Sequence, residues 1–202
     1  MKKVLLACEE SQTCLEVFRN AGINAWSCDI QDCSGSMPEF HIKGDVMEIL
    51  KENWNVIIAF PPCTDLSNAQ LGPVMTKKII EGKPQKALEF IKTIYEAAPF
   101  VCIENPLSWY LNRNWIPYSQ IIQPYYFGHN YMKRTCLWLK NLPFLISTLF
   151  CEPEYKLVKS SNAKYPQNKQ RIKGLHKNAK MRSKFHKGVA EAMCHQWSEY
   201  LK

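Results

Sequence analysis

The chain lacks a long run of apolar residues. None of its segments reaches the roughly 20 consecutive apolar residues that a membrane-spanning helix needs. The first residues place a short apolar run after two lysines, but Glu9 and Glu10 end that run early, so a buried strand is expected there rather than a secretory signal peptide. With 202 residues, 46% of them hydrophobic, the sequence predicts a soluble protein close to the size of a single domain.

Paired cysteine spacing is also lacking. The nine cysteines are odd in number and scattered, which argues against a disulfide framework and favours a reducing, cytoplasmic setting. Cys28, Cys33 and His41 lie within a short span. Zinc sites usually have four ligands at tighter paired spacings, so we expect no metal site from these three residues.

Acidic residues are missing from one stretch. Residues 156–187 hold eleven Lys or Arg and no Asp or Glu, whereas the rest of the chain holds fifteen basic and eighteen acidic residues. A basic segment on a nearly neutral body predicts contact with a polyanion, and DNA is the expected partner. The proposed phosphate contacts are Lys169, Arg171, Lys173 and Lys177. A solvated basic loop is the alternative, because Ser, Asn and Pro are frequent in the same stretch.

Short apolar runs alternate with amphipathic stretches along the chain. Strands are predicted at 3–7, 24–28, 55–60 and 100–103, a closing strand pair at 121–123 and 135–139, and helices at 12–21, 83–98 and 189–201. This order indicates an α/β fold with a mostly parallel sheet and helices on both faces. Sites in such sheets lie beyond the carboxyl ends of the strands, so Asp29, Cys63 and Glu104 are expected to converge at one edge.

Two of these residues stand in short motifs. Pro61-Pro62-Cys63 presents a thiol on a rigid turn after a buried strand, and Glu104-Asn105-Pro106 presents a carboxyl group after the next strand. Pro61-Pro62-Cys63 alone is most often an ordinary tight turn. A thiolate and a carboxylic acid together suit methylation of cytosine, whose carbon 5 becomes nucleophilic only after a nucleophile adds to carbon 6 and ring nitrogen 3 is protonated.

With these motifs the chain resembles the cytosine-5 DNA methyltransferase family over most of its length. Pro61-Pro62-Cys63 resembles the nucleophile motif, Glu104-Asn105-Pro106 the Glu-Asn-Val motif, residues 123–135 the arginine motif and residues 188–192 the last motif. The chain also resembles short methyltransferase-like proteins encoded by bacteriophages, some of which have a similar Ala-Cys-Glu-Glu-Ser-Gln opening. The resemblance implies a Rossmann-like, S-adenosylmethionine-dependent methyltransferase fold formed by a single domain, 1–202.

The resemblance also implies roles for individual residues. Cys63 becomes the nucleophile, Glu104 the group that acts on nitrogen 3, and Arg134 a residue that stabilises the bound cytosine, with Lys133 as its rival because an ungapped match favours that position. S-adenosylmethionine is the implied cofactor. The residues expected at its site are Ala7, Cys8, Glu9, Asp29, Asp45, Pro61 and Val189, with Asp29 on the ribose hydroxyls.

The chain departs from the family pattern in two places. The first loop, residues 7–12, has no glycine where the family has a glycine-rich turn that approaches the cofactor. Only residues 141–186 separate the arginine motif from the last motif, so the basic segment 156–187 is expected in place of a full target-recognition domain. These departures leave two alternatives open: methylation of a free cytosine nucleotide or single-stranded nucleic acid, and a catalytically silent nucleic-acid-binding or host-interaction protein.

Overall fold

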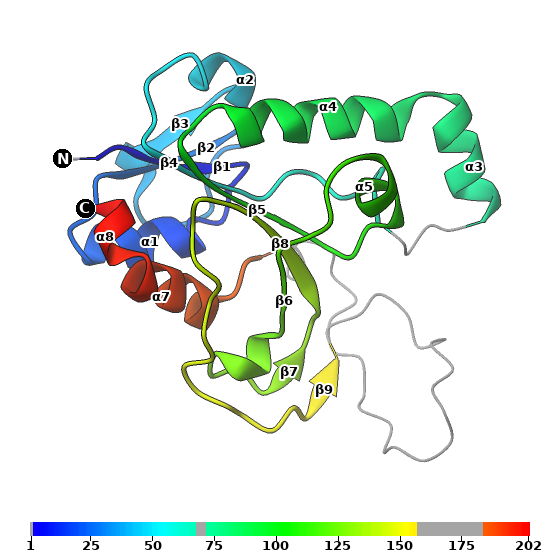
Figure 1. Cartoon of the computed structure of the whole chain (residues 1–202). Helices are drawn as coiled ribbons and strands as arrows, with labels where there is room; N and C mark the ends of the chain where they lie inside the picture. Colours follow the sequence, from blue (N-terminus) through cyan, green and yellow to red (C-terminus); the bar gives the residue numbers. More distant parts are fainter. Residues whose placement is uncertain (1, 68–71, 157–183) are drawn as a thin grey trace.

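A seven-stranded sheet forms the centre of the computed structural model, which describes residues 2–67, 72–156 and 184–202 (Figure 1). The strand order is β3-β2-β1-β4-β5-β8-β6. The strands are β1 (Val4–Ala7), β2 (Ala25–Asp29), β3 (His41–Lys43), β4 (Val56–Ala59), β5 (Phe100–Asn105), β6 (Gln120–Ile122) and β8 (Thr135–Lys140). The first five pair in parallel, whereas β8 lies antiparallel between β5 and β6. The predicted mostly parallel sheet is confirmed.

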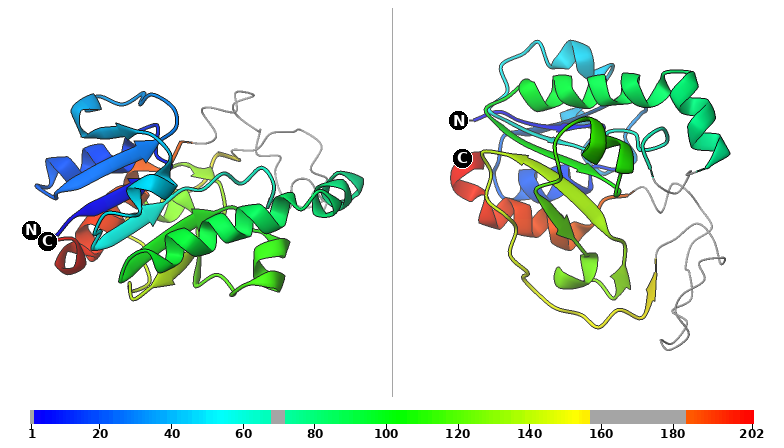
Figure 2. Two further views of the ribbon diagram at one scale, coloured as in Figure 1. Left: turned by 90° about the horizontal axis from the view of Figure 1, so that it is seen from above. Right: turned by 45° about the vertical axis from the view of Figure 1, so that its right-hand side comes forward.

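Helices cover both faces of this sheet (Figure 2). One face packs against α1 (Thr13–Asn20), α7 (Lys187–Gln196) and α8 (Ser198–Leu201), and the other against α2 (Val46–Ile49), α4 (Lys83–Glu96) and α5 (Trp109–Asn114). The predicted final helix is therefore two helices, which meet at Trp197. The indole of Trp197 is buried and donates to the carbonyl oxygen of Pro143 at 3.0 Å, so this side chain fixes the break in the core.

The remaining elements were not predicted from the sequence. They are the 3-10 turns η1 (Pro38–Phe40) and η3 (Pro124–Tyr126), the helix α3 (Pro73–Ile80), and the parallel pair β7 (Tyr131–Met132) and β9 (Tyr155–Lys156). β3 and the short helices α2 and α5 were also missed. Each of these elements is at most eight residues long. Such elements hold too few residues for an apolar period to repeat.

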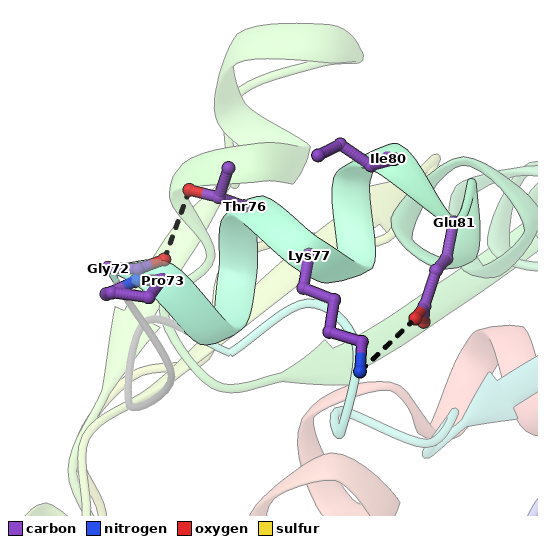
Figure 3. A pocket seen from close by; sticks show the side chains of 6 residues that line it. All are labelled: Gly72, Pro73, Thr76, Lys77, Ile80 and Glu81. Atoms are coloured by element: carbon purple, nitrogen blue, oxygen red, sulfur yellow. Dashed lines mark hydrogen bonds and ion pairs between the residues drawn. The ribbon is translucent and has the colours of Figure 1, made fainter.

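Helix α3 projects from the body at the N-terminal end of α4 (Figure 1). It begins at Pro73, a residue preorganised for a first helical position, after Gly72 with φ 93°. Figure 3 shows the outer side of this helix, where Thr76 donates to the carbonyl oxygen of Gly72 at 3.3 Å and Lys77 lies 3.9 Å from Glu81. Ile80 is exposed on the same side, so this surface is an open hollow rather than an enclosed site.

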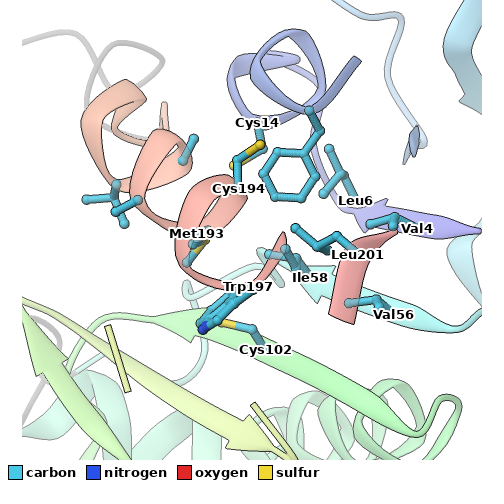
Figure 4. Close-up of a cluster of buried hydrophobic side chains, with 14 of the residues drawn as sticks. Val4, Leu6, Cys14, Val56, Ile58, Cys102, Met193, Cys194, Trp197 and Leu201 are labelled. Atoms are coloured by element: carbon cyan, nitrogen blue, oxygen red, sulfur yellow. The ribbon is translucent and has the colours of Figure 1, made fainter. Parts of the chain in front are cut away.

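The larger part of the core lies between the sheet and the helices α1 and α7 (Figure 4). Side chains from β1, β4 and β5, among them Leu6, Ile58 and Cys102, face Met193 and Trp197 of the C-terminal helices. All of these residues are buried. Burial of apolar surface at about 25 cal/mol per Å² makes this layer a main source of stability, and it holds the strand ends in fixed register.

Candidate active site

The Cys63 turn begins where β4 ends. The carbonyl oxygen of Cys63 accepts hydrogen bonds from the backbone N–H groups of Leu66 at 3.1 Å and Ser67 at 2.9 Å. These two bonds close a tight turn. Two buried side chains fasten this turn to β5 and α5: Asn105 donates to the carbonyl oxygen of Pro61 at 2.9 Å, and Ser108 donates to that of Leu66 at 2.7 Å. The half-buried thiol of Cys63 is thus presented on a backbone held from both sides.

Glu104 lies inside strand β5 rather than beyond it, where it pairs with Leu137 of β8. The hydroxyl of Thr135, at the start of β8, donates a hydrogen bond to the Glu104 carboxylate and also lies 3.0 Å from the carbonyl oxygen of Asn105. Burial of Thr135 and the register of β8 fix the direction of the carboxyl group. Of the three residues expected to converge, Asp29, Cys63 and Glu104, the structure brings Cys63 and Glu104 together, and β8 contributes Thr135.

Electrostatics link Cys63, Glu104 and Lys133. Burial raises the pKa of the Cys63 thiol, the Glu104 carboxylate raises it further, and the Lys133 ammonium opposes both. Burial also raises the pKa of Glu104, against the opposing effects of Lys133 and the Thr135 hydrogen bond. A carboxyl group with a raised pKa holds its proton more readily at neutral pH, and a nearby cation favours a thiolate.

The two candidate cations of the arginine motif lie in different surroundings. Lys133 is half-buried, and its charge acts on both Cys63 and Glu104. Arg134 is exposed, and its charge acts on Cys136, whose pKa is raised to about 12 mainly by burial. The structure therefore brings Lys133 to the thiol–carboxyl pair and directs the charge of Arg134 elsewhere.

A cavity of about 450 Å³ lies at the ends of β1 and β2, and Pro62, the residue directly before Cys63, lines it. Four of the residues predicted for the cofactor line it: Cys8, Glu9, Asp29 and Asp45. The other three, Ala7, Pro61 and Val189, are buried and do not line the cavity. The volume falls in the range of small-molecule pockets, about 300–1,000 Å³.

The glycine-free first loop turns in the left-handed region without glycine. Cys8 has φ 59° and Gln12 has φ 56°, values that residues other than glycine seldom adopt. Between them, the Glu9 carboxylate accepts from the backbone N–H groups of Cys14 at 2.5 Å and Leu15 at 3.2 Å. Glu9 therefore caps helix α1, and its burial raises its pKa to about 8.

Comparisons with known proteins give structural likenesses only. No protein-family model matches the chain, and no curated protein matches it. A mutant DNMT2 of Spodoptera frugiperda has 13% identity and a TM-score of 0.41, with 77% of this chain and 58% of that one covered. The Entamoeba histolytica methyltransferase EhMeth has 16% identity and a TM-score of 0.45, with 75% and 58% covered. The chain spans about 58% of the length of either structure.

The fold is Rossmann-like and of the methyltransferase type. In its sheet, five parallel strands are followed by the antiparallel β8, which is inserted between β5 and β6. The cavity lies outside the carboxyl ends of β1 and β2, the general location for ligands in open α/β sheets.

Several residues of the site were missed in the sequence. Phe60 and Phe185 line the cavity and pack ring to ring with centroids 4.7 Å apart, and Phe90 and Lys184 line it as well. Phe60 directly precedes Pro61, so its position at the strand end offered a signal. Phe185 and Lys184 come from the far end of the chain, and no local pattern could bring them to β4.

The basic residues expected at phosphates, Lys169, Arg171, Lys173 and Lys177, lie outside the described residues. Two ends of the basic segment are described: the backbone of β9 beside β7, and residues 184–187 at the cavity and α7. Within the described ranges, no helix is long and apolar enough to cross a membrane. Over the same ranges, no three His, Cys, Asp or Glu side chains gather as a metal site would require.

Proposed function

We propose that this protein transfers a methyl group from S-adenosylmethionine to carbon 5 of cytosine in DNA, through a covalent adduct at Cys63. The observation that carries the proposal is the joint placement of the Cys63 thiol, the Glu104 carboxyl group and the Lys133 ammonium at adjacent strand ends. These three groups supply a nucleophile, a proton donor and a cation beside a ligand-sized cavity.

The chemistry needs Cys63 as a thiolate and Glu104 as a protonated carboxyl group. Cys63 as thiolate adds to carbon 6 of cytosine, and protonated Glu104 donates to ring nitrogen 3, so that electron density develops on carbon 5. After carbon 5 is methylated, loss of its proton to solvent expels the Cys63 thiolate, and the proton on nitrogen 3 returns to Glu104. A raised Glu104 pKa favours the donor form at neutral pH, and Lys133 favours the Cys63 thiolate.

The charge of the cavity supports the choice of cofactor. Glu10, Asp29 and Asp45 line it against one lysine, Lys184. The first N–H groups of α1, which would bind a pyrophosphate in a dinucleotide site, are taken by Glu9. An acidic cavity without an open helix N-terminus favours a cationic ligand over a dinucleotide.

S-adenosylmethionine fits this cavity because its sulfonium is positively charged and, when bound, makes its methyl group electrophilic. Asp29 would accept hydrogen bonds from the ribose hydroxyls, as an acidic residue after the second strand commonly does. The Phe60–Phe185 pair would exclude water from the apolar side of the cavity.

The basic segment supports nucleic acid as the substrate. Binding to DNA should weaken steeply as salt rises, because phosphate contacts release counterions. Replacing Lys169, Arg171, Lys173 and Lys177 by Gln should flatten the salt dependence and weaken binding to all sequences alike. The matched control replaces Lys77, Lys83, Lys86 and Lys92 of α3 and α4, an equal change in net charge. Equal effects of the two quadruple variants would show that the segment contributes only to the net charge of the protein and makes no specific phosphate contacts.

The function itself is tested with labelled S-adenosylmethionine. The protein is incubated separately with duplex DNA, single-stranded DNA, RNA and cytosine nucleotides, and the label is measured on carbon 5 of cytosine. Label on duplex DNA supports the proposal, and label confined to nucleotides or single strands supports the alternative substrates. No label in any of the four substrates, with the protein folded, supports the silent protein.

A further inference from the structure

One lysine of helix α3, Lys78, contacts the Cys63 turn. The Lys78 ammonium donates to the carbonyl oxygen of Thr64 at 2.6 Å and lies 2.8 Å from the Asp65 carboxylate. Both partners belong to the two residues that directly follow Cys63. The adjacent Lys77 points to the outer hollow of the same helix, toward Glu81 (Figure 3).

The surroundings of Lys78 differ sharply from those of its neighbour. Its side chain is 14% exposed, whereas that of Lys77 is 79% exposed. Withdrawing an ammonium group from water is costly unless charged or polar partners replace the lost hydration. Lys78 is thus held by its two contacts, and a half-buried ion pair constrains geometry more than an exposed one does.

Lys78 completes a set of three attachments around the turn. Asn105 holds the residue two before Cys63, Ser108 holds the residue three after it, and Lys78 holds the two residues in between. We propose that Lys78 is a positioning residue that fixes the Cys63 turn through its contacts with Thr64 and Asp65. This inference rests on the proposed function for its catalytic consequence, but not for its effect on the thiol.

Lys78 contacts the two residues after Cys63 rather than the Cys63 thiol itself. Burial, Glu104 and Lys133 are the influences on the pKa of that thiol from other groups. Lys78 therefore acts through the backbone of residues 64 and 65. Loss of the Lys78 side chain should expose the Cys63 thiol to solvent. It should also turn this thiol away from the orientation needed for attack on a substrate.

The test compares the unmutated protein with Lys78→Met, Lys78→Arg and the control Lys77→Met. Site-resolved mass spectrometry follows alkylation of each cysteine by iodoacetamide, and a DNA duplex containing 5-fluorocytosine with S-adenosylmethionine reports adduct formation at Cys63. We expect Lys78→Met to speed alkylation of Cys63 severalfold and to slow adduct formation by about 10²-fold, since a misplacement near 1 Å can cost that much. Lys78→Arg should restore most of both rates, and Lys77→Met should change neither.

The buried cysteines separate local release from general unfolding. Faster alkylation at Cys63 alone, with Cys14, Cys102 and Cys136 still protected, supports positioning. An unchanged Cys63 rate in Lys78→Met, or an equal rise at all four cysteines, overturns it. If Lys78→Met does not fold, Asp65→Asn removes the ion pair instead, and an unchanged Cys63 rate there overturns the inference. Faster alkylation of Cys63 in Lys78→Met, together with no methyl transfer by the unmutated protein, would support the positioning role and contradict the proposed function.

Discussion

The two halves of the sheet edge are built in different ways. At the ends of β4, β5 and β8, side chains hold the backbone: Asn105, Ser108 and Thr135 are buried and each makes a hydrogen bond to a neighbouring segment. At the ends of β1 and β2, backbone conformation shapes the cavity, with Cys8 in the left-handed region. The first half fixes reactive groups, whereas the second leaves polar groups open to a ligand. Substitutions should therefore affect catalysis in one half and binding or stability in the other.

The largest expected effect belongs to Cys63→Ser. A hydroxyl is a far weaker nucleophile than a thiolate at neutral pH, so methyl transfer should fall by about 10⁴-fold or more, while the fold and the binding of S-adenosylmethionine persist. Labelled methyl transfer and circular dichroism measure the two effects. Cys151→Ser, at another half-buried cysteine, is the control and should stay active. Activity in Cys63→Ser would remove this residue from the mechanism.

Glu104→Gln should slow transfer by about 10²–10⁴-fold, because an amide does not supply the proton that nitrogen 3 needs. The same change should make Cys63 easier to ionise. The Glu104 charge raises the pKa of the thiol, so its removal lowers that pKa and moves the pH midpoint of Cys63 alkylation downward.

Lys133→Met should shift the pH midpoint of Cys63 alkylation in the opposite direction from Glu104→Gln. The Lys133 charge lowers the pKa of Cys63, so its loss should move the midpoint of alkylation upward. The exposed Arg134 is the matched control, and Arg134→Met should leave the midpoint in place. Midpoints that move together in the Glu104 and Lys133 variants would contradict the electrostatic account of the thiol–carboxyl pair.

Asp29→Ala probes the other half of the edge. Loss of the ribose hydrogen bonds should weaken binding of S-adenosylmethionine by about tenfold to a hundredfold, with little change in the rate at saturating cofactor. Calorimetry measures the affinity. Asp32→Ala, an exposed acid paired with Lys43, is the control and should bind normally. Absence of binding in the unmutated protein would overturn the cofactor assignment as a whole.

The smallest effect is expected at Cys8. Glycine adopts positive φ without strain but adds freedom to the unfolded chain, so Cys8→Gly should leave the free energy of unfolding within about 1 kcal/mol of the unmutated protein. Ala7→Gly, one residue earlier in a buried strand, should lower it by about 1–2 kcal/mol. Chemical denaturation compares the two. Equal losses would show that the left-handed conformation at Cys8 carries no strain.

The long buried strands and the Cys63–Glu104 convergence could be predicted from the sequence because they depend on local patterns. The apolar run at β4 and the helical period of α4 each repeat within a few residues. Asn105, Ser108 and Lys78 could not be assigned, because their roles arise from hydrogen bonds to segments 14 to 44 residues away. Phe185 comes to the cavity from just before α7, which packs on α1 far away in the sequence.

The contact between α1 and α7 has a consequence for the order of folding. Thr13–Asn20 is made well before Lys187–Gln196, the helix on which its apolar face packs. Contacts of such sequence separation form slowly, and exposed apolar surface attracts chaperones and other chains in the interval. The apolar face of α1, and the part of the sheet that α7 and α8 cover, must therefore stay exposed until nearly all of these residues have left the ribosome.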